Sequence, residues 1–225
     1  IKAAQTLVDL SKQGDEIFIV DMKDSHNIEL VNEFTTDLED IKDALRNLTI
    51  GGGTALLDGI LLSAEYATKS KNRRKALVII SDGDERDSTF SVAETLNKLS
   101  EYDVQLYMIG FPEALSEDKG IFKPSPRKKA VELINRLTSE SGGQAYFPKD
   151  LTELETIAKK IAADLRSQYI ISYQPSNQKR DGSFRHIQVK LVNNSEQYVI
   201  RARSGYYAPK EGTQPDKSLT SGRGK

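Results

Sequence analysis

Two short segments of the chain place oxygen-bearing side chains where a small cation could bind. In the first, three glycines precede Thr54 and a helical pattern follows. Glycine lets the backbone turn tightly, so the Thr54 hydroxyl can project from the loop. In the second, the apolar run Leu77–Ile80 leads into Ser-Asp-Gly. This pattern is typical of a buried parallel strand that delivers the Asp82 carboxylate to the sheet edge where ligands bind in open α/β folds.

A hydroxyl and a carboxylate are hard oxygen ligands, which suit Mg²⁺, Ca²⁺ or Mn²⁺. The chain has no Cys and only two His, so it offers few ligands for softer metals. Thr54 also has an ordinary interpretation as a helix N-cap that satisfies free backbone N–H groups. Asp58 lies one turn into the same helix. It either supports the ion indirectly or occupies a position that favours negative charge near the helix N-terminus.

The loop after the apolar strand is strongly acidic, because Asp84, Glu85 and Asp87 follow Asp82. A bound cation would relieve the repulsion among these carboxylates, and a solvated loop with raised carboxylate pKa values would do the same. We assign the metal to Asp82 and expect the other three residues to lie at the rim of the site. The Asp-Ser-His run at 24–26 is expected to be a surface turn.

Helical and strand patterns alternate along the chain, which indicates βα units of a parallel sheet. The expected strands are Glu16–Asp21, Lys75–Ser81, Val104–Ile109 and Gln144–Phe147, and the expected helices are Ile1–Lys12, Asp37–Asn47, Ala55–Thr68, Phe90–Tyr102, Arg127–Glu140 and Leu151–Leu165. The segment Phe111–Pro126 contains three prolines and is expected to be a surface loop on the ligand-binding edge. We therefore regard this loop as the candidate for partner contact.

After Leu165 the apolar residues alternate, which is the pattern of β-strands. With turn signals at Asp-Gly and Asn-Asn, residues 168–207 are expected to form a three-stranded antiparallel sheet with one apolar face to cover. His186 is expected to face solvent on one of these strands, and Tyr206 and Tyr207 to pack the last strand. The predicted domains are an α/β domain at 1–165, a β module at 166–208 and a disordered tail at 209–225.

Composition restricts the partners. The formal net charge is −1, which gives no reason to expect nucleic acid or an anionic membrane. The basic run at 69–75 is better explained as a solvated helix end than as a nucleic-acid site. No apolar segment approaches the ~18 residues that span a bilayer.

The Gly-Gly-Thr loop and the strand that ends in Asp-Gly resemble the von Willebrand factor type A domain. Other segments recur in one bacterial branch, the von Willebrand factor A-related proteins typified by Acidobacteria: Phe34–Asp37, Gly142–Phe147, Leu165–Tyr169 and Arg203–Ala208. The resemblance implies a three-layer, doubly wound, mostly parallel α/β sheet. It also implies a metal-ion-dependent adhesion site in which Thr54 coordinates the cation directly and Asp82 contacts it through water.

One part of the family pattern is missing. The family's first strand ends in Asp-x-Ser-x-Ser, and the nearest candidate, Asp21–Ser25, has the wrong spacing. Ile1–Lys12 resembles the family's first helix, so we expect the chain to begin just after this motif. The missing strand would lie between Ile17–Asp21 and Leu77–Ser81, and each buried backbone group left unpaired there costs roughly 1 to 3 kcal/mol. Either a longer parent protein supplies the strand, or the structure omits it, or two chains compensate.

The resemblance implies a non-enzymatic, exported protein-binding module in which a partner's acidic side chain completes the coordination of Mg²⁺. Because only Thr54 and Asp82 remain of the ligand set, we expect weak or absent cation binding. One alternative is a structural or assembly domain without a working metal site. Another is a phosphotransferase of the haloacid dehalogenase type, for which Asp82 and Asp84 would be the paired carboxylates. Arg86 stands where that superfamily has Thr or Val.

Overall fold

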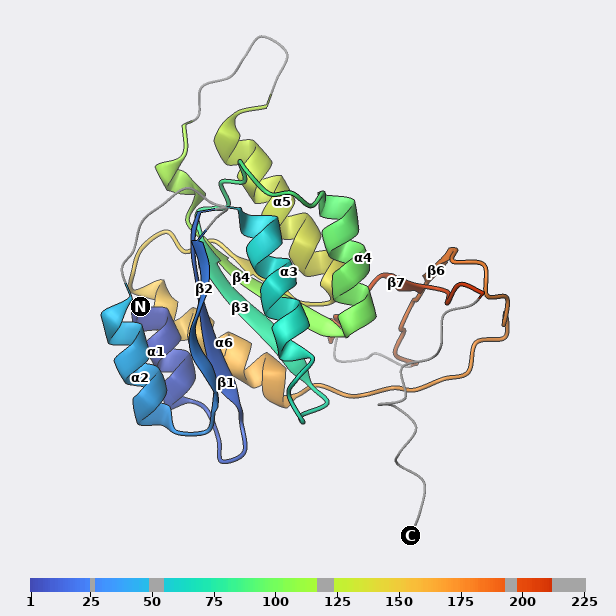
Figure 1. The fold of residues 1–225 in the computed structure, drawn as a ribbon, viewed down its shortest axis with the longest axis horizontal. Helices are drawn as coiled ribbons and strands as arrows, with labels where there is room; N and C mark the ends of the chain where they lie inside the picture. Colours follow the sequence, from blue (N-terminus) through green and yellow to red (C-terminus); the bar gives the residue numbers. More distant parts are fainter. Residues whose placement is uncertain (25–26, 49–54, 117–123, 193–197, 212–225) are drawn as a thin grey trace.

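The computed structural model describes residues 1–24, 27–48, 55–116, 124–192 and 198–211. Its centre is a parallel sheet in the order β3-β4-β5 with helices on both faces (Figure 1). The strands are β3 (Lys75–Ser81), β4 (Val104–Gly110) and β5 (Ala145–Tyr146). One face is covered by α3 (Leu56–Ala67), α4 (Val92–Tyr102) and α5 (Pro126–Ser141), and the other by α1 (Lys2–Asp9) and α6 (Glu153–Arg166). This confirms the three-layer α/β fold.

The pairing of β3 with β4 explains the two apolar layers. The strands run in parallel register from Lys75 beside Val104 to Ser81 beside Gly110. Successive side chains point to opposite faces, so Leu106 and Met108 enter the core under α3, α4 and α5. Tyr107 enters the second core under α1 and α6. Both faces of β4 are therefore buried, as its continuous apolar run predicts.

A second, separate sheet consists of β1 (Ile17–Asp24) and β2 (Asn27–Thr35), which pair antiparallel. Helix α2 (Leu38–Asn47) covers one side of it through Ile41 and Leu45. The sequence predicted β1 but not β2, whose ladder contains register shifts that interrupt a regular two-residue pattern. The turn expected at 24–26 falls at the link between these strands, and residues 25 and 26 lie outside the described residues.

The two sheets are not joined by hydrogen bonds between β1 and β3 in the described part of the chain. These are the strands that the sequence placed on either side of a missing strand. The side chains of residues 17–22 in β1 are all half-buried, and Ile80 in β3 is 38% exposed. Strands in the middle of a parallel sheet are normally buried on both faces. By their exposure, β1 and β3 thus resemble edge strands rather than interior strands of a sheet.

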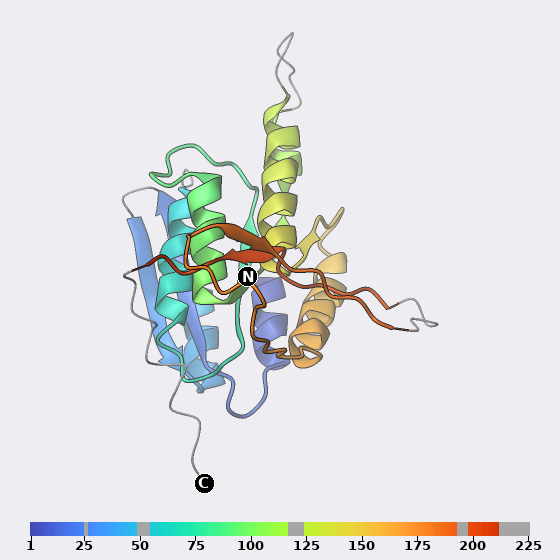
Figure 2. The same cartoon turned by 90° about the vertical axis from the view of Figure 1, so that its right-hand side faces the viewer.

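The C-terminal region differs from the expected three-stranded sheet. It contains two short antiparallel strands, β6 (Phe184–His186) and β7 (Gly205–Tyr207), and residues 168–174 form no strand. The alternating apolar pattern remains, but its side chains are uncovered: Tyr169 is 91% exposed. Figure 1 shows this region as extended segments beside the α/β layers, and in the turned view of Figure 2 it lies in front of them. The prediction was wrong in extent, since only β6 and β7 pair in the part of this region that the structure describes; β7 lies against α4, where the Ser100 hydroxyl donates a 3.1 Å hydrogen bond to the Gly205 carbonyl.

Local signals place the helix starts accurately. Asp37 caps α2 by accepting a 2.9 Å hydrogen bond from the Glu39 N–H. Ser91 and Glu94 form a reciprocal capping box at the start of α4. Ser125 caps α5, whose first residue is a proline. None of the helices in the described ranges is both long and apolar enough to cross a bilayer.

Candidate cation and partner-binding edge

The candidate site lies at the C-terminal end of β3, where the chain leaves the sheet through Asp82 and Gly83. Gly83 has a φ of +79°, and a Cβ there would lie 2.6 Å from Ile134 Cδ1 of α5. Glycine is therefore required both by the backbone conformation and by the close approach of α5. Asp82 is half-buried, and its Oδ1 accepts a 3.0 Å hydrogen bond from the Asp84 N–H. This bond fixes the carboxylate at the sheet edge.

The N-terminus of α3 lies against the same loop. Side chains about thirty positions away in the sequence accept hydrogen bonds from its free N–H groups. Ala55 provides no side-chain cap. Instead the Leu57 N–H donates to Glu85 Oε2 at 3.0 Å and to Ser88 Oγ at 3.1 Å. Glu85 Oε1 also accepts from the Ser88 N–H at 2.9 Å. Glu85 is thus a helix cap rather than the rim residue that the sequence predicted.

Asp58 completes this contact from the helix side. It is 9% exposed, and each carboxylate oxygen accepts one backbone hydrogen bond: Oδ2 from Thr89 at 2.9 Å and Oδ1 from Phe90 at 3.1 Å. We call Asp58, Glu85 and Ser88 the α3 clamp. Both oxygens of Asp58 bind backbone N–H groups of the loop that follows Asp82. Asp58 therefore helps to position the sheet edge at the end of β3.

The remaining acidic residues are partly neutralised by an arginine on the same loop. Arg86 Nη2 lies 2.5 Å from Asp84 Oδ2. Asp84, followed by the charges of Asp82 and Asp87, raises the pKa of Arg86 above its ordinary value. Asp84 is half-buried and Asp87 is exposed. The charge excess noted in the sequence is therefore relieved in part without a cation.

Only one of the two predicted metal ligands lies among the described residues. Asp82 is at the predicted strand end, whereas Thr54 lies outside the described residues. In the described part of the chain, no three Asp, Glu, His or Cys side chains come together as a metal-binding group. The Asp82 carboxylate is a suitable type of ligand for a hard cation. Mg²⁺ and Ca²⁺ require more oxygen ligands than this one carboxylate provides. The pairing of Thr54 with Asp82 remains a prediction.

The expected partner loop begins at this same edge. The Phe111 N–H donates a 3.0 Å hydrogen bond to the Ser81 carbonyl, and the 3-10 helix η1 (Pro112–Ala114) follows. Arg127 Nη2 lies 2.8 Å from Glu113 Oε1, which ties the start of the segment to α5. Residues 117–123 lie outside the described residues. The ends of the segment 111–126 are thus anchored near Asp82.

Sequence reasoning missed the α3 clamp because its partners are about thirty positions apart, and a local pattern shows only caps within a few residues. The clearest signal available was the acidic composition of the loop. His186, by contrast, is exposed as predicted, with its ring edge-on to Phe184 at 4.9 Å between centroids.

Several solved structures from bacteria have a similar fold. A von Willebrand factor type A protein from Catenulispora acidiphila is 15% identical with a TM-score of 0.60, over 75% of this chain and 38% of that one. An aerotolerance-related membrane protein from Bacteroides fragilis is 18% identical with a TM-score of 0.57, over 74% and 86%. The vWF domain of the type V pili tip protein Mfa5 from Porphyromonas gingivalis is 13% identical with a TM-score of 0.52, over 76% of this chain and 90% of that one.

At these identities the likeness establishes the fold alone. No curated protein sequence matches the chain. The family profile described as von Willebrand factor type A domain matches residues 2–160, which is more than half of the chain and includes β3, the α3 clamp and Asp82. The chain therefore belongs to the von Willebrand factor type A domain family.

Proposed function

We propose that the chain is a non-enzymatic protein-binding module that engages its partner at the C-terminal end of β3. A divalent cation, Mg²⁺ or its analogue Ca²⁺ or Mn²⁺, would be held by Thr54 and Asp82 and would accept an acidic side chain of the partner as a further ligand. The observation that supports this proposal is the position of the Asp82 carboxylate, which is fixed at the sheet edge beside the N-terminus of α3.

The residues around Asp82 are suited to this role. One oxygen of Asp82 is held by the Asp84 N–H, and the other has no partner among the described residues. The α3 clamp fixes the loop on one side, and the anchored ends of segment 111–126 border the edge on the other. A cation supplies positive charge for a partner carboxylate, while these backbone contacts limit the movement of the loop. Binding would then lose less conformational entropy.

The family also supports a protein partner. Domains of this family are commonly protein-interaction modules. Among the structural neighbours are a pilus tip protein and a proximal thread matrix protein from the mussel byssus, which has a TM-score of 0.54. Two bacterial neighbours are named as a pili tip protein and as a membrane protein. We accordingly propose an exported location for this protein.

The cation proposal is tested with Mn²⁺, whose unpaired electrons broaden nearby amide NMR signals. We expect the broadening to be strongest at the amides of Gly83 and Asp84 and in the first turn of α3, and to decrease with distance from Asp82. Asp82→Asn and Thr54→Ala should each abolish it. Asp87→Asn, which removes an exposed carboxylate from the same loop, should leave it unchanged. Equal broadening in the Asp82 and Asp87 variants would show that Mn²⁺ senses only the acidic loop.

A structural domain without a metal site is the second candidate. It is favoured by the lack of a three-residue metal cluster within the described ranges and by the Arg86–Asp84 ion pair, which already neutralises part of the edge. The same Mn²⁺ experiment separates the two functions, because a structural domain would show no broadening that depends on Thr54 and Asp82.

A further inference from the structure

Strand β5 forms an open edge of the parallel sheet, with β4 on one side only. The Met108 N–H donates a 3.0 Å hydrogen bond to the Gln144 carbonyl, and Met108 stands opposite Ala145 in the register. In a parallel ladder of this kind, the N–H and C=O of Ala145 point away from β4. Among the described residues neither group has a hydrogen-bond partner outside the sheet. Ala145 is only half-buried, so its backbone is accessible.

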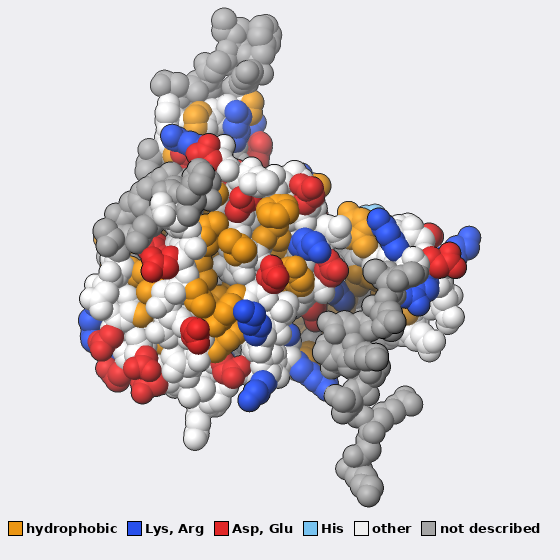
Figure 3. Space-filling view, in the orientation of Figure 1, with side chains coloured by type: hydrophobic (Ala, Val, Ile, Leu, Met, Phe, Trp, Pro, Cys, Tyr) orange, Lys and Arg blue, Asp and Glu red, His pale blue; other side chains and the backbone are white. Residues whose placement is uncertain are grey.

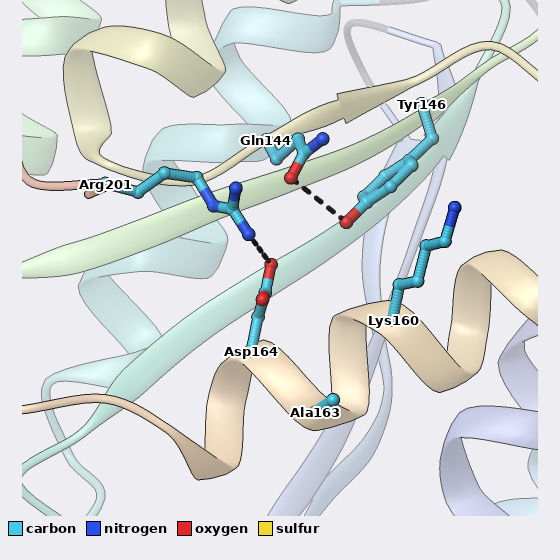
Figure 4. Close-up of a pocket in the computed structure, with 6 residues that line it drawn as sticks. All are labelled: Gln144, Tyr146, Lys160, Ala163, Asp164 and Arg201. Atoms are coloured by element: carbon cyan, nitrogen blue, oxygen red, sulfur yellow. Dashed lines mark hydrogen bonds and ion pairs between the residues drawn. The ribbon is translucent and has the colours of Figure 1, made fainter. Parts of the chain in front are cut away.

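A hollow lies beside this edge on each face of the sheet. The one on the α6 side has a volume of about 320 Å³ and is lined by Gln144, Tyr146, Lys160, Ala163, Asp164 and Arg201 (Figure 4). The one on the α5 side has a volume of about 550 Å³ and is lined in part by Arg136 and Thr138. Side chains of a strand alternate between the two faces of a sheet. A strand added to β5 would therefore place successive side chains in the two hollows.

The hollow on the α6 side favours a negatively charged side chain. Arg201 Nη2 lies 2.5 Å from Asp164 Oδ2, so the charge of Arg201 is balanced. Lys160 has no carboxylate partner in the described part of the chain, and Figure 4 shows Lys160 and Arg201 on opposite sides of Tyr146. The Tyr146 hydroxyl donates to Gln144 Oε1 at 3.2 Å and leaves the amide N–H groups of Gln144 available. The lining thus carries one excess positive charge and several donors.

We propose that the open edge of β5 binds an extended segment of a partner protein as an added strand, with an Asp or Glu side chain of that segment in the hollow between Lys160 and Arg201. Backbone hydrogen bonds to Ala145 would supply affinity, and the two hollows would select side chains at alternate positions. Arg201 belongs to the C-terminal region beyond residue 160, where the family match ends. This contact extends the proposed protein-binding function to a second edge and needs no cation.

The charge selection is tested with a fluorescein-labelled peptide of about nine residues, the length of a typical strand, with alternating valine and threonine and a central glutamate. Fluorescence anisotropy should show binding that is about tenfold weaker when the central residue is glutamine, because a charge-assisted hydrogen bond is lost. Lys160→Gln should weaken binding of the glutamate peptide by a similar factor. The matched control is Lys159→Gln, whose Nζ is already paired with Glu155 at 2.7 Å, and it should bind as the wild type does.

The added strand is tested with Ala145→Pro. Proline lacks the outward N–H, and it is tolerated on an edge strand whose N–H faces solvent. Peptide binding should be lost while the thermal unfolding midpoint is kept. If this variant fails to fold, the peptide can be changed instead. Methylation of alternate backbone nitrogens in the peptide removes its hydrogen bonds to the Ala145 backbone, and such a peptide should not bind the wild type.

Three outcomes would overturn this proposal: no binding of the glutamate peptide at millimolar concentration, equal binding of the glutamate and glutamine peptides, or unchanged binding by folded Ala145→Pro. Amide NMR shifts should map to β5 and α6, and shifts confined to other elements would also contradict it. Asp82→Asn and chelation with EDTA should leave peptide binding unchanged. The failure of one proposal is therefore distinguishable from the failure of the other.

Discussion

Tyr146 stands where β5, α6 and the C-terminal segment meet, and its phenol is in an environment that disfavours ionisation. Burial, followed by the nearby Asp164 carboxylate, raises the pKa of Tyr146 to about 12. The same two causes raise the pKa of Tyr107, which lies under α6. Both hydroxyls therefore stay protonated across the physiological range and act as neutral hydrogen-bond groups beside the Arg201–Asp164 pair.

This pKa predicts an alkaline loss of stability. A tyrosine in the unfolded chain ionises near pH 10, so between about pH 10 and 12 the unfolded state loses its proton while folded Tyr146 keeps it. The free energy of unfolding should fall as pH rises through this window, and below it the ionisation of Tyr146 should add no pH dependence. Tyr146→Phe should make the fall shallower, with the slope due to Tyr107 remaining. Urea unfolding of both proteins between pH 8 and 11.5 measures this.

The comparison below pH 9 serves as the control for this prediction. There Tyr146→Phe should differ from the wild type by a constant, about 0.5 to 1.5 kcal/mol for the lost hydrogen bond to Gln144. Parallel curves over the whole range would contradict the raised pKa.

At the scale of elements, the α3 clamp couples a helix to the loop that carries Asp82. Glu85→Ala removes the acceptor of the Leu57 N–H and of the Ser88 N–H. We expect it to lower the free energy of unfolding by about 1 to 2 kcal/mol, the usual cost of a lost helix cap. Urea denaturation measures the change. Asp87→Ala is the matched control, since Asp87 is an exposed acid on the same loop, and it should change stability by less than about 0.5 kcal/mol.

A loss from Glu85→Ala no larger than that from Asp87→Ala would mean that water replaces the cap. The prediction is also informative about the site. If Glu85 positions the edge, its removal should weaken Mn²⁺ binding less than Asp82→Asn does, because Glu85 is not a proposed ligand.

The elements that sequence predicts best are those specified by neighbouring residues. Lys75–Ser81 is a strand with the predicted bounds, because its apolar run is continuous and its ends are polar. Asp37 caps α2 as predicted, because the cap depends on a hydrogen bond two positions away. In both cases the information lies within a few residues. Such short-range signals fix where most helices and strands of the α/β layers begin.

The features that sequence did not predict depend on distant parts of the chain. The Glu85 cap of α3 is made across 28 positions. Strand β2 is specified by pairing with β1 through a shifted register, which a two-residue period does not reveal. The C-terminal segments have a clear alternating pattern, yet only β6 and β7 pair. Alternation indicates which side chains share a face, and pairing also requires a surface that covers that face.

At the scale of the whole molecule, the sheet is in two parts that meet through side chains. Phe18 of β1 and Phe34 of β2 contact Tyr66 of α3, with ring centroids 5.0 Å from Tyr66 in both cases. Figure 3 shows apolar side chains gathered over this side of the molecule, and Leu30 and Leu62 are 37% and 51% exposed. No strand ladder connects β1 to β3 in the described residues. The β1–β2 sheet is thus attached mainly by packing on α2 and α3.

This arrangement predicts two levels of stability. Amides of β4, whose strand is central and buried, should exchange with solvent only on global unfolding, whereas amides in the β1–β2 ladder should exchange at least about tenfold faster through local opening. Tyr66→Ala removes the aromatic contact with Phe18 and Phe34, so it should widen this difference, and the exposed-site control Thr68→Ala should not. Hydrogen exchange followed by NMR measures both. Equal protection of β1 and β4 would mean that the two sheets unfold together and that packing alone couples them as strongly as a continuous ladder would.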